Sequence, residues 1–154
     1  MMRPAQRVGI GAAIAAYVID QASKAVVIAY GPHLQSGIEV LPVFNLVFTR
    51  NRGVSFGLLS GLPGWGLLFL GLLVVTVLSV WLWRTDLRLS ATAIGLAIGG
   101  ALGNITDRSR FGGVTDFLDF HLRGYHWPAF NFADVAIVGG LGLLLLQQPK
   151  WRSS

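Results

Sequence analysis

Residues 65–83 have the sequence WGLLFLGLLVVTVLSVWLW, and none of these nineteen side chains carries a charge. At 1.5 Å per residue, an α-helix of this length spans about 28 Å, close to the thickness of the hydrocarbon core of a bilayer. Tryptophans stand at both ends, as in helices whose ends lie in the two membrane interfaces. The stretch therefore predicts a transmembrane helix.

Three further apolar blocks are each long enough to cross a bilayer: residues 8–30, 89–106 and 127–148. Only 12% of all residues are charged, about half of the roughly 25% that is usual in soluble proteins. The block at residues 89–106 carries Gly95, Gly99 and Gly103 at four-residue spacing. This spacing predicts a ridge that packs closely against a neighbouring helix. We predict an all-α membrane protein with four transmembrane helices and one domain, residues 1–154.

The distribution of charge also excludes several functions. Twelve Lys and Arg residues and seven Asp and Glu residues give a net charge of +5, but the basic residues stand singly or in pairs beside the apolar blocks, which argues against a nucleic-acid partner. Six Lys and Arg residues flank the apolar blocks on the side of the membrane that holds the termini, and five flank them on the other side. The positive-inside rule then weakly favours cytoplasmic termini. The chain has no Cys and its three His residues lack metal-ligand spacing, so we predict neither a metal nor a cofactor.

The segment between the first two apolar blocks has a different pattern. From Ile38 to Phe48 apolar residues recur with period two, Asn51-Arg52-Gly53 is typical of a turn, and the alternation resumes at Val54. This pattern predicts a small β-hairpin or curved sheet over residues 38–58, with Pro42 at an edge or a bulge. Because open backbone is not tolerated in hydrocarbon, we place the segment at the membrane surface.

Two ionisable residues interrupt the first predicted helix. Asp20 and Lys24 are four residues apart, so they share one helix face. One interpretation is an ion pair that lowers the cost of membrane insertion. Another, compatible with it, is that both face a polar cavity and help to position a ligand there.

Asp134 is the only charged residue of the last apolar block, about two turns inside it. A purely structural interpretation pairs it with Lys24, Arg108 or Asn131 of another element. The alternative is a carboxyl kept available for proton transfer.

A second carboxyl could meet Asp134 if the preceding loop folds back over the membrane surface. Two carboxyls in contact share a proton, and such a pair can activate water for attack on an amide, as in aspartic proteases. The residues alone do not choose among Asp107, Asp116 and Asp119 as this partner.

The chain resembles the lipoprotein signal peptidase family, also called signal peptidase II. Five segments carry the resemblance, in register along almost the whole chain: DQASK at 20–24, FTRNRGVSF at 48–56, GGALGNITDR at 99–108, GVTDF at 113–117 and FNFAD at 130–134. Any one of these motifs is weak by itself. Together, in order and spacing, they form a specific pattern.

The resemblance implies a monomeric, metal-independent aspartic endopeptidase of the bacterial inner membrane, with Asp116 and Asp134 as the catalytic pair. It would cleave diacylated prolipoproteins just before the lipidated cysteine, with substrate and membrane lipid as its partners. The termini would be cytoplasmic, the site would lie near the outer face, and residues 38–58 would form an extracytoplasmic β-cradle opposite a short loop helix between residues 110 and 127. Residues expected to bind substrate or support the pair are Asp20, Lys24, Asn51, Gly53, Asn104, Asp107, Arg108 and Asn131.

Two other functions remain as alternatives. A small proton-coupled carrier could use Asp20, Lys24 and Asp134 as a relay, but it would need polar residues through the depth of several helices, and the apolar blocks 65–83 and 89–106 contain no charge. The other alternative is a catalytically silent family member that only binds lipoproteins.

Overall fold

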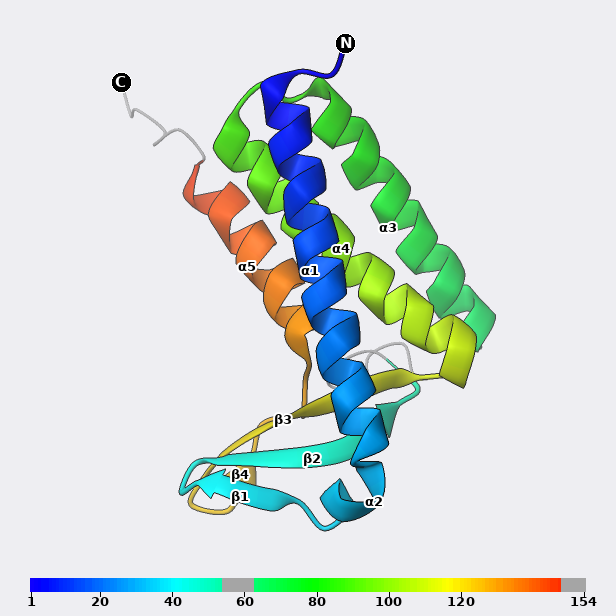
Figure 1. Ribbon diagram of the computed structural model, residues 1–154, viewed down its shortest axis with the longest axis vertical. Coiled ribbons are helices and arrows are strands. Elements are labelled where there is room, and N and C mark those ends of the chain that lie inside the picture. The colour runs from blue at the N-terminus through cyan, green and yellow to red at the C-terminus, as the bar shows by residue number, and fades with distance from the viewer. Residues whose placement is uncertain (54–62, 148–154) are drawn as a thin grey trace, which may run out of the picture.

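The computed structural model describes residues 1–53 and 63–147. Four long helices run beside one another, and a small sheet lies across one end of them (Figure 1). These helices are α1 (Pro4–Ala29), α3 (Gly64–Arg84), α4 (Arg88–Phe111) and α5 (Phe132–Leu146). The start of α1 and the end of α5 both lie at the end opposite the sheet (Figure 1).

Helices α1, α3 and α4 are each long and apolar enough to cross a membrane, so the chain is a multi-pass membrane protein. Helix α5 has 15 residues and a length of about 22 Å. It begins at Phe132, later than the predicted start at residue 127. The reason is pairing with the sheet, because Phe130 exchanges backbone hydrogen bonds with Leu118, and Asn131 then caps the helix.

Helix α4 is the centre of the bundle. In its apolar window 61% of the residues are buried, against 22% in α1 and 17% in α3. A Cβ added at Gly95 would collide with the backbone carbonyl of Gly9, and one at Gly103 would collide with the carboxylate of Asp20. The predicted glycine ridge is confirmed, and the helix that packs against it is α1.

The sheet has four antiparallel strands in the order β1-β2-β3-β4. The strands are β1 (Ile38–Leu41), β2 (Phe44–Asn51), β3 (Val114–Leu122) and β4 (Tyr125–His126). Strands β1 and β2 form the predicted hairpin, with Pro42 in its turn. The predicted strand that starts at Val54 lies outside the described residues. A four-residue helix, α2 (Gly31–Leu34), connects α1 to the sheet.

The connection from α4 to α5 corrects two expectations. The loop helix expected between residues 110 and 127 is absent from this described segment, where α4 continues to Phe111 and strands β3 and β4 follow. The prediction of an all-α fold with a cradle formed by residues 38–58 alone is therefore incomplete. Two of the four strands of the sheet come from the connection between α4 and α5. Residues 114–122 form a strand that pairs with β2.

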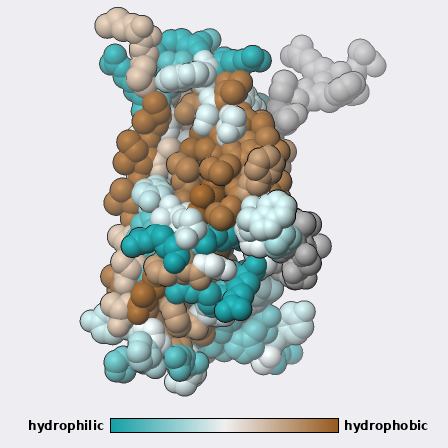
Figure 2. Space-filling model, turned by 90° about the vertical axis from the view of Figure 1, so that its right-hand side faces the viewer, coloured by the Kyte–Doolittle hydropathy of each residue, from teal (hydrophilic) through white to brown (hydrophobic). Residues whose placement is uncertain are grey.

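The sheet joins the helices at the inner end of β3. Residues 114–117 are almost fully buried there, whereas the outer part of the strand is more exposed. Thr49 pairs with Asp116 and Asn51 pairs with Val114. This register brings Asn51 and Asp116 together where the sheet meets the helices. On one face of the molecule, apolar side chains cover much of the helices between hydrophilic regions at both ends (Figure 2).

Candidate active site

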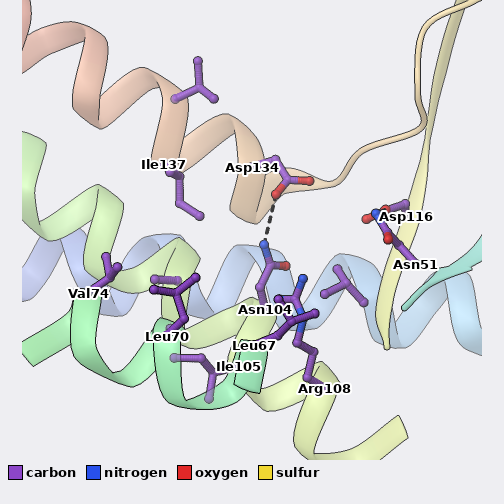
Figure 3. Close-up of a pocket in the computed structure, with 14 residues that line it drawn as sticks. Asn51, Leu67, Leu70, Val74, Asn104, Ile105, Arg108, Asp116, Asp134 and Ile137 are labelled. Atoms are coloured by element: carbon purple, nitrogen blue, oxygen red, sulfur yellow. Dashed lines mark hydrogen bonds between the residues drawn. The ribbon is translucent and has the colours of Figure 1, made fainter. Parts of the chain in front are cut away.

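A cavity of about 340 Å³ lies between α3, α4, α5 and the inner end of the sheet. Its walls are mostly apolar, from Leu67, Leu70, Val74, Ile105 and Ile137 among others. Five polar residues line it as well, and Figure 3 shows them grouped at one side of the apolar wall: Asn51, Asn104, Arg108, Asp116 and Asp134. All five were predicted as site residues from the sequence.

The first turn of α5 positions Asp134. Asn131 is the N-cap of the helix, and its side-chain oxygen accepts a hydrogen bond from the Asp134 backbone N–H over 3.1 Å. In return, Asp134 Oδ2 accepts from the Asn131 N–H over 3.2 Å. This reciprocal capping box fixes the carboxylate at the start of the helix, so Asp134 lies in the first turn of α5 rather than about two turns inside the helix, as expected.

Strand β3 positions Asp116, which is 2% exposed. Asn51 Nδ2 donates to its Oδ2 over 3.0 Å, and Asn131 Nδ2 donates to its Oδ1 over 2.6 Å. Asn131 therefore contacts both carboxylates, through its side chain to Asp116 and through its backbone to Asp134. The strand and the helix that carry the two acids are held together by this one residue, which is fully buried.

The pKa of the Asp116 carboxyl is raised to about 6, mainly because the residue is buried. The hydrogen bonds from Asn51 and Asn131 lower this pKa, and the negative charge of Asp134 raises it further. A carboxyl with this pKa exchanges a proton near neutral pH, as general acid–base catalysis requires.

The other oxygen of Asp134 is held from α4. Asn104 Nδ2 donates to Asp134 Oδ1 over 3.0 Å, and Asn104 Oδ1 accepts from Lys24 Nζ over 2.9 Å. Lys24 also lies 2.9 Å from Asp20 Oδ2 and 3.5 Å from Asp107 Oδ2, with all three side chains at most 1% exposed. Because Lys24 can only donate, it orients the Asn104 amide so that its NH₂ group faces Asp134.

The buried cluster Asp20–Lys24–Asp107 therefore lies behind the cavity and does not line it. The predicted intrahelical pair of Asp20 and Lys24 is confirmed. Its carboxylates also fix neighbouring elements, since Asp20 accepts from the Ala133 N–H over 2.9 Å and Asp107 accepts from the Thr115 N–H over 2.8 Å. These bonds tie α1 to α5 and α4 to β3.

Arg108 and Gly53 form the remaining side of the site. Arg108 Nη2 donates to the Gly53 carbonyl over 2.9 Å, and the Gly53 N–H donates to Asn51 Oδ1 over 3.0 Å. Together they fix the amide of Asn51 toward Asp116. Among the described residues, the Nε of Arg108 is buried without a hydrogen-bond partner.

Two contributors were missed from the sequence. Gln21 donates to the carboxylates of Asp20 and Asp107, and Thr115 is fully buried and accepts from Arg50 Nη1 over 2.7 Å. Both are direct sequence neighbours of predicted residues, and this adjacency was the available signal.

Asp119 is not part of the cavity. Its carboxylate contacts His126 Nδ1 over 2.9 Å and Asn45 Nδ2 over 3.1 Å on the outer part of the sheet. In the described ranges 1–53 and 63–147, no group of three His, Asp or Glu side chains could hold a metal ion.

The sequence profile of the signal peptidase (SPase) II family matches residues 12–149. The chain belongs to this family. It is 42% identical over 139 residues to the lipoprotein signal peptidase of Beijerinckia indica, a match that covers 88% of this chain and 83% of that protein. The lipoprotein signal peptidase of Aeromonas hydrophila is also 42% identical over 139 residues, with 87% and 83% covered. The family resemblance seen in the sequence is confirmed.

Two solved structures of bacterial membrane enzymes share the fold of this chain. A bacterial membrane enzyme superposes with a TM-score of 0.78 at 32% identity, and the match covers 92% of this chain and 92% of that one. A second structure of a bacterial membrane enzyme gives the same TM-score and identity, with 90% and 85% covered. The chain is therefore a member of a peptidase family that processes lipoproteins, and its overall fold is that of a known membrane enzyme.

Proposed function

We propose that this chain is an intramembrane aspartic endopeptidase that removes signal peptides from diacylglyceryl-modified prolipoproteins, with Asp116 and Asp134 as the catalytic pair. The observation that carries the proposal is the bridge through Asn131, which joins both carboxylates at one end of one cavity. The names of the curated relatives support the substrate class.

The chemistry follows from two carboxyls that share one proton. The ionised carboxylate takes a proton from a water molecule, whose oxygen attacks the scissile carbonyl carbon. The protonated carboxyl then passes its proton to the leaving amide nitrogen, and the C–N bond breaks. No step of this reaction requires a metal.

Every carboxylate oxygen of the pair accepts one hydrogen bond from the protein. The donors are the side chains of Asn51, Asn104 and Asn131 and the backbone of Asn131. This arrangement holds both groups before substrate binds, so little reorganisation is needed in the transition state. The guanidinium of Arg108 lies on the same cavity wall and supplies positive charge beside the pair.

The architecture suits a substrate that is anchored in the bilayer. The cavity lies where the helices meet the sheet, so a lipid-anchored chain would present its scissile bond at a fixed depth. We place the protein in the bacterial inner membrane as a monomer, with four spans, cytoplasmic termini and the site near the outer face.

The test is the cleavage of a diacylated prolipoprotein by purified Asp116→Asn and Asp134→Asn variants. Both should lose at least about a thousandfold in kcat, since neither can supply the second carboxyl. Asp119→Asn is the matched control, because Asp119 is a buried carboxylate of the same strand outside the cavity. Near wild-type turnover in either variant of the pair would refute the assignment.

A further inference from the structure

A second groove reaches the catalytic pair from the other side of α5. It has a volume of about 560 Å³ and is lined by Trp127 and Phe130 before the helix and by Asp134, Val135, Val138 and Gly139 of the helix. Its size falls within the range of about 300–1,000 Å³ that is usual for small-molecule sites.

Helix α5 separates this groove from the cavity of the candidate active site. Asp134 and Val138 line both spaces, so the two apolar paths meet at a carboxylate of the pair. The substrate class proposed above has two apolar parts that diverge from the scissile bond, namely a signal peptide on one side and a diacylglyceryl group on the other.

The two spaces differ in the polar groups that they offer. The first cavity contains Asn51, Asn104 and Arg108, which can bind the N–H and C=O groups of a peptide backbone. The second groove has no polar side chain other than Asp134 and the indole of Trp127. An extended peptide would leave its backbone groups without partners in the second groove, whereas hydrocarbon requires none.

We infer that the second groove binds the acyl chains of the diacylglyceryl group, while the peptide occupies the first cavity. This inference rests on the proposed function and adds a substrate subsite to it. Trp127 is 55% exposed and Val138 is 69% exposed, so the groove is open to the bilayer along its length. Acyl chains can therefore reach it sideways, without leaving the membrane.

The direction of the groove fits this occupant. It begins at the first turn of α5, where the sheet ends, and runs to Gly139, about 10 Å further along the helix and away from the sheet. Trp127 lies at the start of the groove, where an aromatic side chain suits the membrane interface. The glycerol would then lie near Trp127 and the chains would extend toward the bilayer centre.

Two glycines of α5 make a matched pair of variants. A Cβ added at Gly139 or at Gly142 would meet no described atom within 4 Å, so a side chain at either position starts in open space. Gly139 lines the groove, and Gly142, three residues further along the same helix, does not. Gly139→Leu should fill the groove, whereas Gly142→Leu adds the same side chain outside it.

The experiment compares prolipoprotein peptides that carry dipalmitoylglyceryl or dibutyrylglyceryl cysteine. The readout is the ratio of kcat/KM for the long-chain substrate to that for the short-chain substrate, in wild-type protein, Gly139→Leu and Gly142→Leu. We expect Gly139→Leu to lower this ratio about tenfold or more, the size that apolar pocket contacts give, and Gly142→Leu to keep the wild-type ratio. Thermal unfolding checks that all three proteins are folded.

Two results would overturn the inference: an unchanged ratio in Gly139→Leu, whether or not its activity falls equally for both substrates, or an equal fall of the ratio in Gly142→Leu. Each of these leaves the proposed function standing, because wild-type cleavage still depends on Asp116 and Asp134. Wild-type protein that cleaves neither substrate would overturn the proposed function, and this inference with it.

Discussion

Replacement of Lys24 by Met tests the electrostatic design behind the site. Lys24 Nζ lies 2.9 Å from Asp20 Oδ2, 3.5 Å from Asp107 Oδ2 and 2.9 Å from Asn104 Oδ1. Methionine has a similar length and suits an apolar interior, but it carries no charge and no donor. The variant therefore leaves two buried carboxylates without their cation and the Asn104 amide without the donor that orients it.

Removing one partner of a buried ion pair costs about 3–5 kcal/mol, because the remaining charge stays buried without compensation. The positive charge of Lys24 compensates the negative charges of Asp20 and Asp107. We therefore expect Lys24→Met to lower the free energy of unfolding by about 4 kcal/mol. The assay is reversible denaturation in detergent, followed by circular dichroism. The variant should also lose kcat, since Asn104 no longer holds Asp134 in one orientation.

Two further variants make this prediction specific. Arg84→Met removes an exposed arginine and should change the free energy of unfolding by no more than about 0.5 kcal/mol. Asp20→Asn combined with Lys24→Met removes both charges of the closest pair and should be more stable than Lys24→Met alone. The reasoning is refuted if Lys24→Met stays within about 1 kcal/mol of wild type, or if the double variant is the less stable of the two.

The remaining predictions concern the pair and the topology. Asn131→Ala should lower the free energy of unfolding by about 1–2 kcal/mol through loss of the cap, and it should also lower kcat. Asn131→Asp should keep the cap and still lower kcat, because it places a third carboxyl beside Asp116. Full activity of either variant would contradict the bridging role of Asn131. Since burial raises the pKa of Asp116 to about 6, the pair holds its proton below that pH, and kcat/KM should fall as the pH rises above about 6; a flat profile from about pH 5 to pH 8 would contradict this. Chelators should leave cleavage unchanged, and restoration of lost activity by zinc or calcium would overturn the metal-independent mechanism. A reporter fused after Ser154 should show a cytoplasmic location, and an external signal would reverse the orientation.

Much of the site could be predicted from single positions. Asp20, Lys24 and Asp134 stand out because charges in apolar blocks are costly and need a partner or a function. The other four polar residues that line the cavity, Asn51, Asn104, Arg108 and Asp116, were assigned to the site by the family resemblance. The choice of Asp116 over Asp119 came from the family resemblance, because single positions do not separate two acids three residues apart. The register with β2 gives the physical reason, since it puts Asp116 beside the helices and Asp119 at the outer part of the sheet.

The errors in the predicted fold lie where pairing is non-local. Residues 114–122 were expected to be a loop with a short helix nearby, and they form β3 because β2, far away in the sequence, offers a free edge. The start of α5 moved for the same reason, since Phe130 is held by Leu118. A period in hydrophobicity describes one segment at a time and does not contain the partner strand.

The sequence by itself determined the membrane class, three helices within a few residues of their ends, the glycine ridge of α4 and the family. These properties depend on the length, apolarity and local spacing of single segments, or on motifs in register, which are all present in the linear chain. The family motifs named Asp116 and Asp134 as the pair, but only the tertiary structure decided how Asn131 joins them, why Lys24 lies behind the cavity, and that two apolar paths meet at Asp134. Each of these depends on the packing of elements distant in sequence, because hydrogen bonds and buried charges act over a few ångströms in space whatever the separation along the chain.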